Sequence, residues 1–156
     1  MIDSEGYRYN VGIILINRDN EVFWGRRKSG DSWQFPQGGI IEGEDPDTAM
    51  FRELNEELGL LSEHVEIIAK TKDWLYYDVP GTYKRSKNAY RGQKQIWYLL
   101  KFVGQDYHIN LKSHIEQEFD AWRWIEYWQP IKEVVKFKED VYDKALHELS
   151  GFIKFA

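Results

Sequence analysis

The hydrophobic pattern divides the chain into short β-branched runs and a few segments with apolar residues three or four positions apart. Residues 9–17 (YNVGIILIN) are dense in Ile and Val, which predicts a buried strand. Turn-forming residues at 17–20 and the segment 21–26 (EVFWGR) then predict the returning strand of a hairpin. Further strands are expected at 33–36, 65–71, 74–79, 93–103 and 118–126.

One helix is signalled at both ends. Asp45 is a good N-cap, Pro46 suits the first helical position, and Gly59 suits the C-terminal stop, so the helix is expected over 46–58. Two further helices are expected at 130–135 and 138–152, the second with Val141, Ala145 and Leu149 spaced four apart. Strands on both sides of a central helix predict an α/β fold, in which a mixed β-sheet is sandwiched between α-helices (α/β/α) in a single domain.

The totals narrow the class of protein. A length of 156 residues with 42% hydrophobic residues suits one domain with a sizeable core. The absence of Cys removes disulfide partners and thiolate chemistry, and no apolar run approaches a membrane span. No secretory signal is visible at the start, so a reducing, cytoplasmic setting is expected. With a net charge of −5, a nucleic-acid substrate would need a local basic surface or metal ions.

The helix at 46–58 carries an unusual set of carboxylates. At about 100° per residue, Glu53, Glu56 and Glu57 share an arc of roughly 100°, beside an apolar stripe that contains Leu54. Two interpretations are open at this point. The arc is either a solvated acidic face or, because a flexible Gly38-Gly39 backbone precedes the same helix, a site for a hard cation such as Mg²⁺ or Mn²⁺.

The stretch Gly38–Leu60 reads G-x5-E-x7-R-E-L-x-E-E-x-G-L. It resembles the Nudix box at every one of the nine defined positions. The resemblance implies the layered α/β/α Nudix fold over one domain at about 6–149. It also implies hydrolysis of a nucleoside diphosphate linked to another moiety, with a divalent metal as cofactor, Mg²⁺ or Mn²⁺.

The resemblance also assigns roles within the box. Glu53, Glu56 and Glu57 would be metal ligands, together with the backbone carbonyl of Gly38. Glu53 or Glu57 would act as the general base toward water. Arg52 would pair with Glu44 and orient the catalytic turn.

The similarity extends beyond the box. It covers Gly6–Arg8, Asn10–Gly12, Ser32–Gly39, Gly92–Gln95, Glu118–Asp120 and Phe137-Lys138. These segments resemble bacterial RNA 5′-pyrophosphohydrolases and the related dinucleoside polyphosphate hydrolases. The former convert 5′-triphosphate RNA ends to monophosphates and so promote 5′-end-dependent mRNA decay. Tyr9 and Gln117 stand where the family commonly has Pro, and residues 79–91 match poorly.

By this wider resemblance, several residues outside the box would complete the site. Glu118 would be a further metal ligand or base, the alternative being an exposed acid at a strand end. Phe137 would stack on a base beside Arg27, the alternative being a core residue. The remaining substrate contacts would come from Arg8, Arg27 and Lys94 (phosphates), Gln34, Gln95 and Tyr77 (pocket lining), and backbone groups of Val135 and Lys138 (base edge). Trp33, Trp97, Trp122 and Trp124 are expected in the core, and the four histidines receive no role.

Three functions therefore compete. The first is RNA 5′-triphosphate pyrophosphohydrolysis, and the second is cleavage of diadenosine polyphosphates by the same box. The third is a non-catalytic nucleotide-binding module, against which the intact Arg52, Glu53, Glu56 and Glu57 argue. Basic residues that could guide an RNA tail occur at Arg26–Lys28, at Lys84, Arg85, Lys87 and Arg91, and at Lys132, Lys136 and Lys138.

Overall fold

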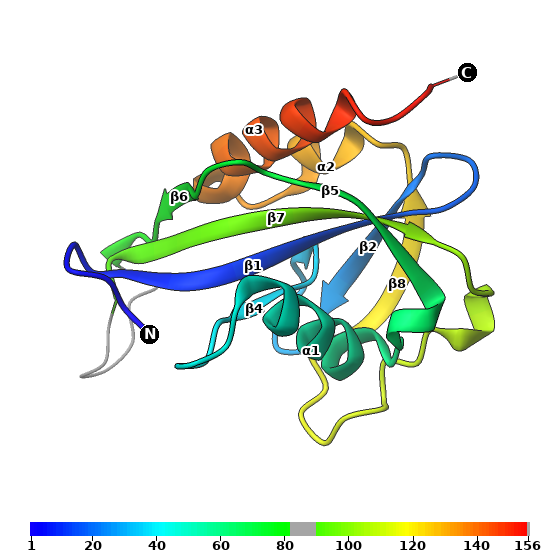
Figure 1. Cartoon of the computed structure of the whole chain (residues 1–156), viewed down its shortest axis with the longest axis horizontal. Coiled ribbons are helices and arrows are strands. Elements are labelled where there is room, and N and C mark those ends of the chain that lie inside the picture. Colours follow the sequence, from blue (N-terminus) through cyan, green and yellow to red (C-terminus); the bar gives the residue numbers. More distant parts are fainter. Residues whose placement is uncertain (82–89, 156) are drawn as a thin grey trace.

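Two long parallel strands form the centre of the molecule. The computed structural model describes residues 1–81 and 90–155. In it, β1 (Tyr7–Ile16) and β7 (Gly92–Phe102) pair in parallel from Tyr7↔Gly92 to Ile16↔Lys101. Figure 1 shows them side by side across the molecule. The starts of β1 and β7 lie about 85 residues apart in the sequence, so the pairing at the centre of the fold joins distant parts of the chain.

The other strands extend this pair on both sides. β5 (Val65–Lys70) and β6 (Leu75–Asp78) run antiparallel to β7. β2 (Val22–Arg27) pairs antiparallel with β1, and β3 (Trp33–Gln34) and β8 (Phe119–Ile125) both pair with β2. A strand that the hydrophobic pattern does not predict, β4 (Gln37–Gly39), pairs with β1 opposite Asn10, Val11 and Gly12.

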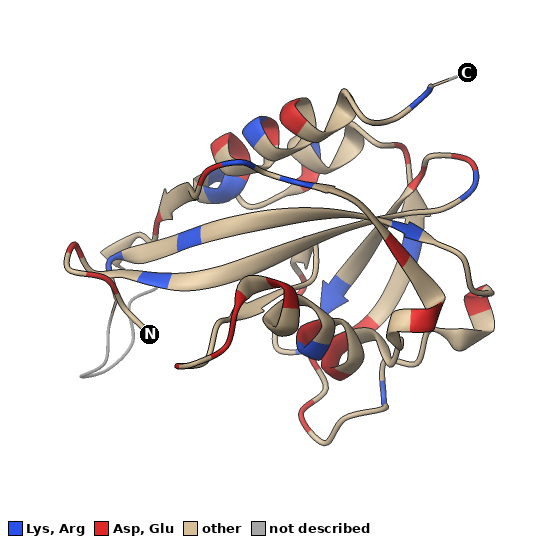
Figure 2. Ribbon diagram, viewed as in Figure 1, with Lys and Arg blue, Asp and Glu red and all other residues tan. Residues whose placement is uncertain are grey.

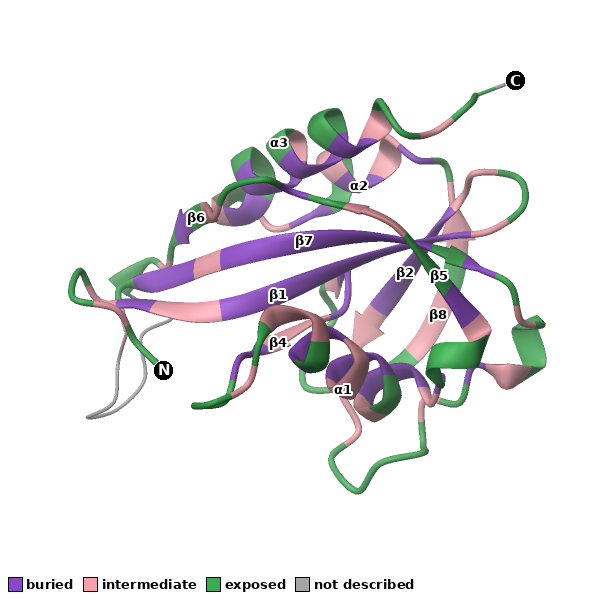
Figure 3. Cartoon of the chain, viewed as in Figure 1, coloured by how far each residue is buried: buried purple, intermediate pink, exposed green. Residues whose placement is uncertain are grey.

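Helices cover both faces of this sheet. α1 (Pro46–Leu58) lies on one face, and α2 (Gln129–Glu133) and α3 (Glu139–Ser150) lie on the other (Figure 1). Short 3-10 turns occur at Ser62–His64, Asp106–His108 and Lys136–Lys138. The sheet is buried by both layers, and α1 and α3 are buried on the sides that face it (Figure 3). The predicted mixed sheet between helices is confirmed.

The caps of α1 are the ones that the sequence predicts. The Asp45 side chain accepts a hydrogen bond from the Thr48 N–H at 2.8 Å. At the other end Gly59 adopts a left-handed conformation with φ of 71° and donates its N–H to Asn55 O at 2.9 Å. The bounds of this helix therefore agree with the prediction, and Leu54 is fully buried on its inner side.

The C-terminal helix buries the apolar stripe that its spacing predicts. Val141, Ala145 and Leu149 are all fully buried in a core cluster that also contains Trp97. α3 ends at Ser150, two residues before the predicted end. Of the segment 79–91, which matches the family poorly, residues 82–89 lie outside the described residues. In the described part of the chain, no helix is both long and apolar enough to cross a membrane.

Tyr142 ties α3 to the segment that precedes the Gly-Gly strand, because its buried hydroxyl accepts the Phe35 N–H at 3.0 Å. Tyr142→Phe leaves that buried N–H without an acceptor, so we expect the free energy of unfolding to fall by about 1–3 kcal/mol. Urea unfolding measures this loss. Tyr107→Phe, at a tyrosine that is 80% exposed, is the matched control and should change stability little. Equal stability of the two variants would contradict this role for Tyr142.

Candidate active site

A large pocket lies where α1, β1, β4, β7 and the loop before β8 meet. Its volume is about 1360 Å³. Acids on α1 and cations on the strands border it, and Figure 2 shows Asp and Glu along α1 and the loop before it, with Lys and Arg on β1, β2 and β7. The lining includes Arg8, Asn10, Arg27, Lys28, Gln34, Gln37, Gly38, Gly39, Glu53, Glu56, Glu57, Tyr77, Tyr90, Gln93, His114, Glu118, Phe137 and Lys138.

Arg52 joins the parts of the box. Its Nε donates to Glu44 Oε2 at 2.8 Å, and its Nη2 donates to Glu44 Oε1 at 3.0 Å and to Gly39 O at 2.8 Å. Its Nη1 donates to Glu53 Oε1 at 2.7 Å and to Glu56 Oε2 at 3.2 Å. The hydrogen bonds between Arg52 and Glu44 are the main reason why the pKa of Arg52 is raised and the pKa of Glu44 is lowered. One guanidinium thus fixes the β4 backbone, the connecting loop and two carboxylates.

Gly38 is required for the close approach of β4 to α1. A Cβ at position 38 would lie 1.9 Å from the Glu53 carboxyl carbon, so the Glu53 carboxylate rests directly against the Gly38 backbone. At Gly39 a Cβ would lie 2.1 Å from an Arg8 guanidinium nitrogen. Gly38 and Gly39, neighbouring residues of β4, therefore leave room for the Glu53 carboxylate and the Arg8 guanidinium.

The acids of α1 do not form a solvated face. Glu53 and Glu57 are 9% and 5% exposed, while Glu56 is intermediate. Burial, followed by the hydrogen bond and charge of Glu53, raises the pKa of Glu57 well above its usual range. The Oε1 atom of Glu57 is buried without a hydrogen-bond partner. These observations overturn the interpretation of the arc as an ordinary solvated surface.

The donor set fits a hard divalent cation. In the ranges 1–81 and 90–155, no three His, Asp or Glu side chains stand as a ready-made metal cluster, and Arg52 engages one oxygen each of Glu53 and Glu56. However, the Oε1 atom of Glu57 is buried without a hydrogen-bond partner, and the pKa of this carboxyl is raised. A cation bound beside Glu57 would stabilise its charged form. Carboxylate oxygens near a strand backbone are the ligands that Mg²⁺ and Mn²⁺ prefer.

Glu118 borders the same pocket from the loop before β8. It directly precedes β8, where the register of the β2–β8 pairing shifts between Arg26 and Arg27. The Arg27 Nε lies 3.3 Å from Glu118 Oε1, although this nitrogen has no partner in hydrogen-bond geometry. The contact is therefore an ion pair without a hydrogen bond, and the Arg27 Nε–H can still donate to another acceptor. Glu118 is thus placed where a further metal ligand or base could act.

The predicted substrate residues Arg8, Gln34, Tyr77 and Phe137 also line the pocket. The rings of Tyr77 and Phe137 lie 5.9 Å apart between centroids. The pKa of Tyr77 is raised to about 12, mainly by burial. Phe137 is partly buried against the core and also lines the pocket. Its position is therefore compatible with both predicted roles, packing in the core and stacking on a base.

Lys138 enters the pocket through its side chain. The Nζ donates to Gln34 Oε1 at 3.0 Å and to Gln37 Oε1 at 3.3 Å, and it lies 5.5 Å from the centre of the Tyr77 ring. Burial lowers the pKa of this amine to about 8. The predicted use of Val135 and Lys138 backbone groups stays a prediction. The Lys138 N–H donates to Val135 O at 3.0 Å, and Val135 is not part of the pocket lining in the described chain.

The predicted contacts Lys94 and Gln95 lie on opposite faces of β7. Neighbouring residues of a strand point to opposite faces, so the two side chains cannot both face the pocket. Lys94 lies on the α1 face, paired with Asp3 at 3.0 Å and 4.8–5.4 Å from the ring centres of Tyr9, Trp74 and Tyr76. Gln95 is on the pocket side but fully buried beneath it. Neither residue lines the pocket among the described residues.

Several lining residues were missed by the sequence analysis. Asn10, Gln37 and Gln93 are polar residues in or beside buried strands, and polarity at a buried strand position is a signal that could have found them. His114 was assigned no role, yet its Nε2 lies 4.0 Å from Glu56 Oε1. It is placed there by an irregular loop, for which the sequence carries no comparable signal.

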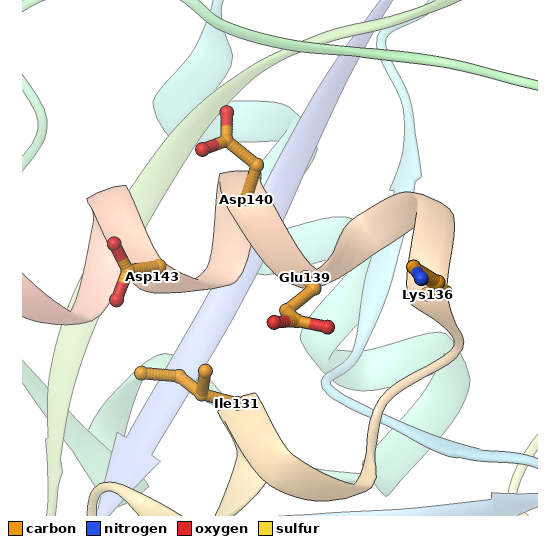
Figure 4. A pocket seen from close by; sticks show the side chains of 5 residues that line it. All are labelled: Ile131, Lys136, Glu139, Asp140 and Asp143. Carbon is orange, nitrogen blue, oxygen red and sulfur yellow. The ribbon is translucent and has the colours of Figure 1, made fainter.

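A second hollow of about 450 Å³ lies between α2 and α3 (Figure 4). Its lining is Ile131, Lys136, Glu139, Asp140 and Asp143. Asp140 pairs with Lys144 at 3.0 Å and Asp143 with His147 at 3.2 Å, each within α3. Among the described residues, none of this lining has a buried side-chain atom without a hydrogen-bond partner, so the hollow lacks the feature that Glu57 provides beside α1.

The family model for the NUDIX domain matches residues 6–145 of the chain. Solved structures share the fold at low identity. An Ap4A hydrolase from C. elegans is 20% identical with a TM-score of 0.68, and the match covers 92% of this chain and 98% of that one. The dihydroneopterin triphosphate pyrophosphohydrolase of E. coli is 16% identical with a TM-score of 0.68, over 91% and 98%. The NUDIX domain of Shewanella oneidensis NrtR, in complex with ADP ribose, is 14% identical with a TM-score of 0.59, over 92% and 88%.

The buried amine of Lys138 predicts a pH-dependent stability. Its pKa is lowered from 10.5 to about 8 on folding, so between these values the unfolded chain binds more protons than the folded one. Stability therefore rises with pH in this window, by on the order of 3 kcal/mol. The difference in unfolding free energy between wild type and Lys138→Met should shift in favour of wild type from pH 7 to pH 10.

Denaturant unfolding at several pH values measures this difference. Lys144→Met, at an exposed lysine, is the control and should show no such drift relative to wild type. A wild-type advantage that stays constant between pH 7 and pH 10 would mean that Lys138 keeps an ordinary pKa in the folded protein.

Proposed function

Because the chain belongs to the NUDIX family, we propose that it is a phosphoanhydride hydrolase acting on the triphosphate at the 5′ end of RNA. The products would be a 5′-monophosphate end and pyrophosphate. Removal of the two terminal phosphates would expose the transcript to 5′-end-dependent decay. The cofactor would be a divalent cation, Mg²⁺ or Mn²⁺.

The observation that carries this proposal is the division of charge within one pocket. Glu53, Glu56 and Glu57 border it from α1 and Glu118 from the β8 side, whereas Arg8, Arg27 and Lys138 border it from the strands and the 3-10 turn. A polyphosphate needs both kinds of group, because cations neutralise its charge and carboxylates hold the metal that it shares. This arrangement supports hydrolysis better than it supports simple binding of a neutral ligand.

The roles of the side chains follow from their positions. The bound cation would neutralise developing phosphate charge and make a water molecule more acidic. Glu53 or Glu57 would accept the proton from that water. Arg52 does not line the pocket in the described part of the chain; it holds Glu53 and Glu56 in place through its Nη1. Arg8, Arg27 and Lys138 would bind phosphate oxygens.

The RNA part of the proposal rests on the aromatic side of the pocket. Phe137 lines it, and so do Arg27 and Lys28, which can contact a base and the following phosphate. Stacking on aromatic or guanidinium planes is how single-stranded RNA is commonly held. Three of the basic residues proposed to guide an RNA tail, Lys84, Arg85 and Lys87, lie outside the described residues.

A dinucleoside polyphosphate is the second candidate substrate. The pocket contains aromatic rings at two places, Phe137 beside Tyr77 and Tyr90 beside Arg8, whose guanidinium lies 5.6 Å from the Tyr90 ring centre. Two such places suit a molecule with two bases. A structurally similar protein is an Ap4A hydrolase, and this supports the same alternative.

Glu53→Gln and Glu57→Gln should each lower kcat by at least about a hundredfold, because each removes a metal ligand or the base while preserving shape. Phosphate or pyrophosphate release in Mg²⁺ and in Mn²⁺ measures the rate. Glu66→Gln, at an exposed residue of β5, is the control and should keep wild-type activity. More than a tenth of the wild-type rate in either box variant would count against the assignment.

The substrate is decided by a side-by-side assay. We expect a higher kcat/KM for triphosphate-ended RNA than for diadenosine tetraphosphate, since the basic and aromatic lining can contact more than one nucleotide of an RNA. The reverse preference would favour the dinucleotide. Metal-independent binding of both, with no product in either metal, would favour a nucleotide-binding module.

A further inference from the structure

One face of the central strand pair changes from core to pocket floor along its length. On the side facing α3, Ile14 of β1 and Leu99 of β7 are fully buried apolar residues. Toward the other end of the same face the residues are polar, namely Arg8, Asn10, Gln93 and Gln95. Trp97 stands at the boundary, and its indole lies over Gly12, where a Cβ would be 2.5 Å from the ring.

The indole of Trp97 fixes the direction of the amides next to it. Its Nε1 donates to Gln95 Oε1 at 3.1 Å. Since an indole N–H can only donate, the oxygen of Gln95 must face Trp97 and the nitrogen must face away. That Nε2 donates to Asn10 Oδ1 at 2.9 Å. The orientation of the Asn10 side chain is therefore set from behind, by groups that do not reach the pocket.

This relay leaves the Nδ2 of Asn10 facing a site without a partner. Asn10 is 1% exposed and lines the pocket, and its Nδ2 is buried without any hydrogen bond. An unpaired buried donor is costly, and the great majority of such groups have an acceptor. A ligand atom that accepts a hydrogen bond would remove this cost.

The surroundings of Asn10 select an anionic acceptor. Arg8 precedes Asn10 by two residues and lies on the same face of β1. Gly39 is the cross-strand partner of Asn10, and a Cβ on Gly39 would meet the Arg8 guanidinium at 2.1 Å. Lys138 Nζ reaches the neighbouring Gln37 at 3.3 Å, and Gln95 Nε2 approaches the same Gln37 oxygen at 3.4 Å. Two cationic side chains, Arg8 and Lys138, therefore line the same pocket as Asn10, and an oxygen of a polyphosphate suits this position.

We propose that Asn10 Nδ2 binds an oxygen of the substrate's polyphosphate chain, and that Gln95, oriented by Trp97, is the positioning residue behind it. The proposal rests on the hydrolase function proposed above and adds a binding group outside the box. It also predicts that Gln95, which would not contact the substrate, determines whether Asn10 presents a donor or an acceptor to the pocket.

The substitution Gln95→Glu tests this relay directly. Both oxygens of a glutamate accept, so one would take the Trp97 N–H and the other would face Asn10 Oδ1. The Asn10 amide would then turn over to donate to residue 95, and its oxygen would face the substrate. Asn10→Asp places an acceptor there by direct replacement, and Asn10→Ala removes the donor without adding charge.

The probe is a tripolyphosphate with methylene bridges, which cannot be hydrolysed, bound in the presence of Mn²⁺ and followed by calorimetry. Each of the three variants should raise the Kd for the probe by about ten- to a hundredfold. Gln95→Glu acts through the Asn10 amide, so adding it to Asn10→Ala should weaken probe binding little beyond Asn10→Ala alone. In turnover assays KM should rise with kcat nearly unchanged, and the Kd for Mn²⁺ alone should stay as in wild type.

Gln105→Glu is the control for added charge, because this exposed residue follows the opposite end of β7. Urea unfolding checks that each variant is folded, and Asn10→Ala decides the matter where a buried carboxylate prevents folding. Probe binding within twofold of wild type in folded Asn10→Ala would overturn the proposal even if the enzyme hydrolyses RNA ends. Weakened probe binding in a protein that hydrolyses no triphosphate would support it and reject the proposed function alone.

Discussion

The catalytic side of the pocket depends on the five hydrogen bonds of Arg52. They reach Glu44 in the loop, the Gly39 carbonyl of β4, and Glu53 and Glu56 on α1. Without a guanidinium at this point, three acids would repel one another across a flexible loop. A lysine could not replace it, since an ammonium has three N–H donors on one nitrogen, whereas the Arg52 guanidinium makes five hydrogen bonds from three nitrogens. The positions of Glu53 and Glu56, two of the carboxylates that could hold a metal, therefore depend on one planar cation.

Much of the fold could be predicted because the signals are local. Asp45, Pro46 and Gly59 define α1 by cap chemistry alone, and the spacing of Val141 and Leu149 defines the buried side of α3. The strand β4 could not be found in this way. Its residues Gln37–Gly39 have no strand character, and they form a strand because β1 offers free hydrogen-bonding groups beside them. Pairing between distant segments is not encoded in the local pattern.

The same distinction explains the site. The acids of α1 could be located because a helix converts spacing into direction. Lys94 was given a role by resemblance alone, without regard to strand alternation, which turns its side chain to the α1 face. Asn10 was overlooked because its importance comes from its neighbours. Its side chain is ordinary in sequence and becomes informative only when the Trp97 indole and Gln95 amide are seen behind it.

Four buried side-chain atoms in the described part of the chain lack a hydrogen-bond partner, and all belong to residues that line one pocket. Two are donors, Asn10 Nδ2 and Arg27 Nε, and two are acceptors, Glu57 Oε1 and Gln93 Oε1. A free anion would satisfy the donors and leave Glu57 uncompensated, while a free cation would do the reverse. A metal–polyphosphate complex presents both charges together and can satisfy both kinds of atom. The orphaned atoms thus indicate a site built for that complex rather than for either component alone.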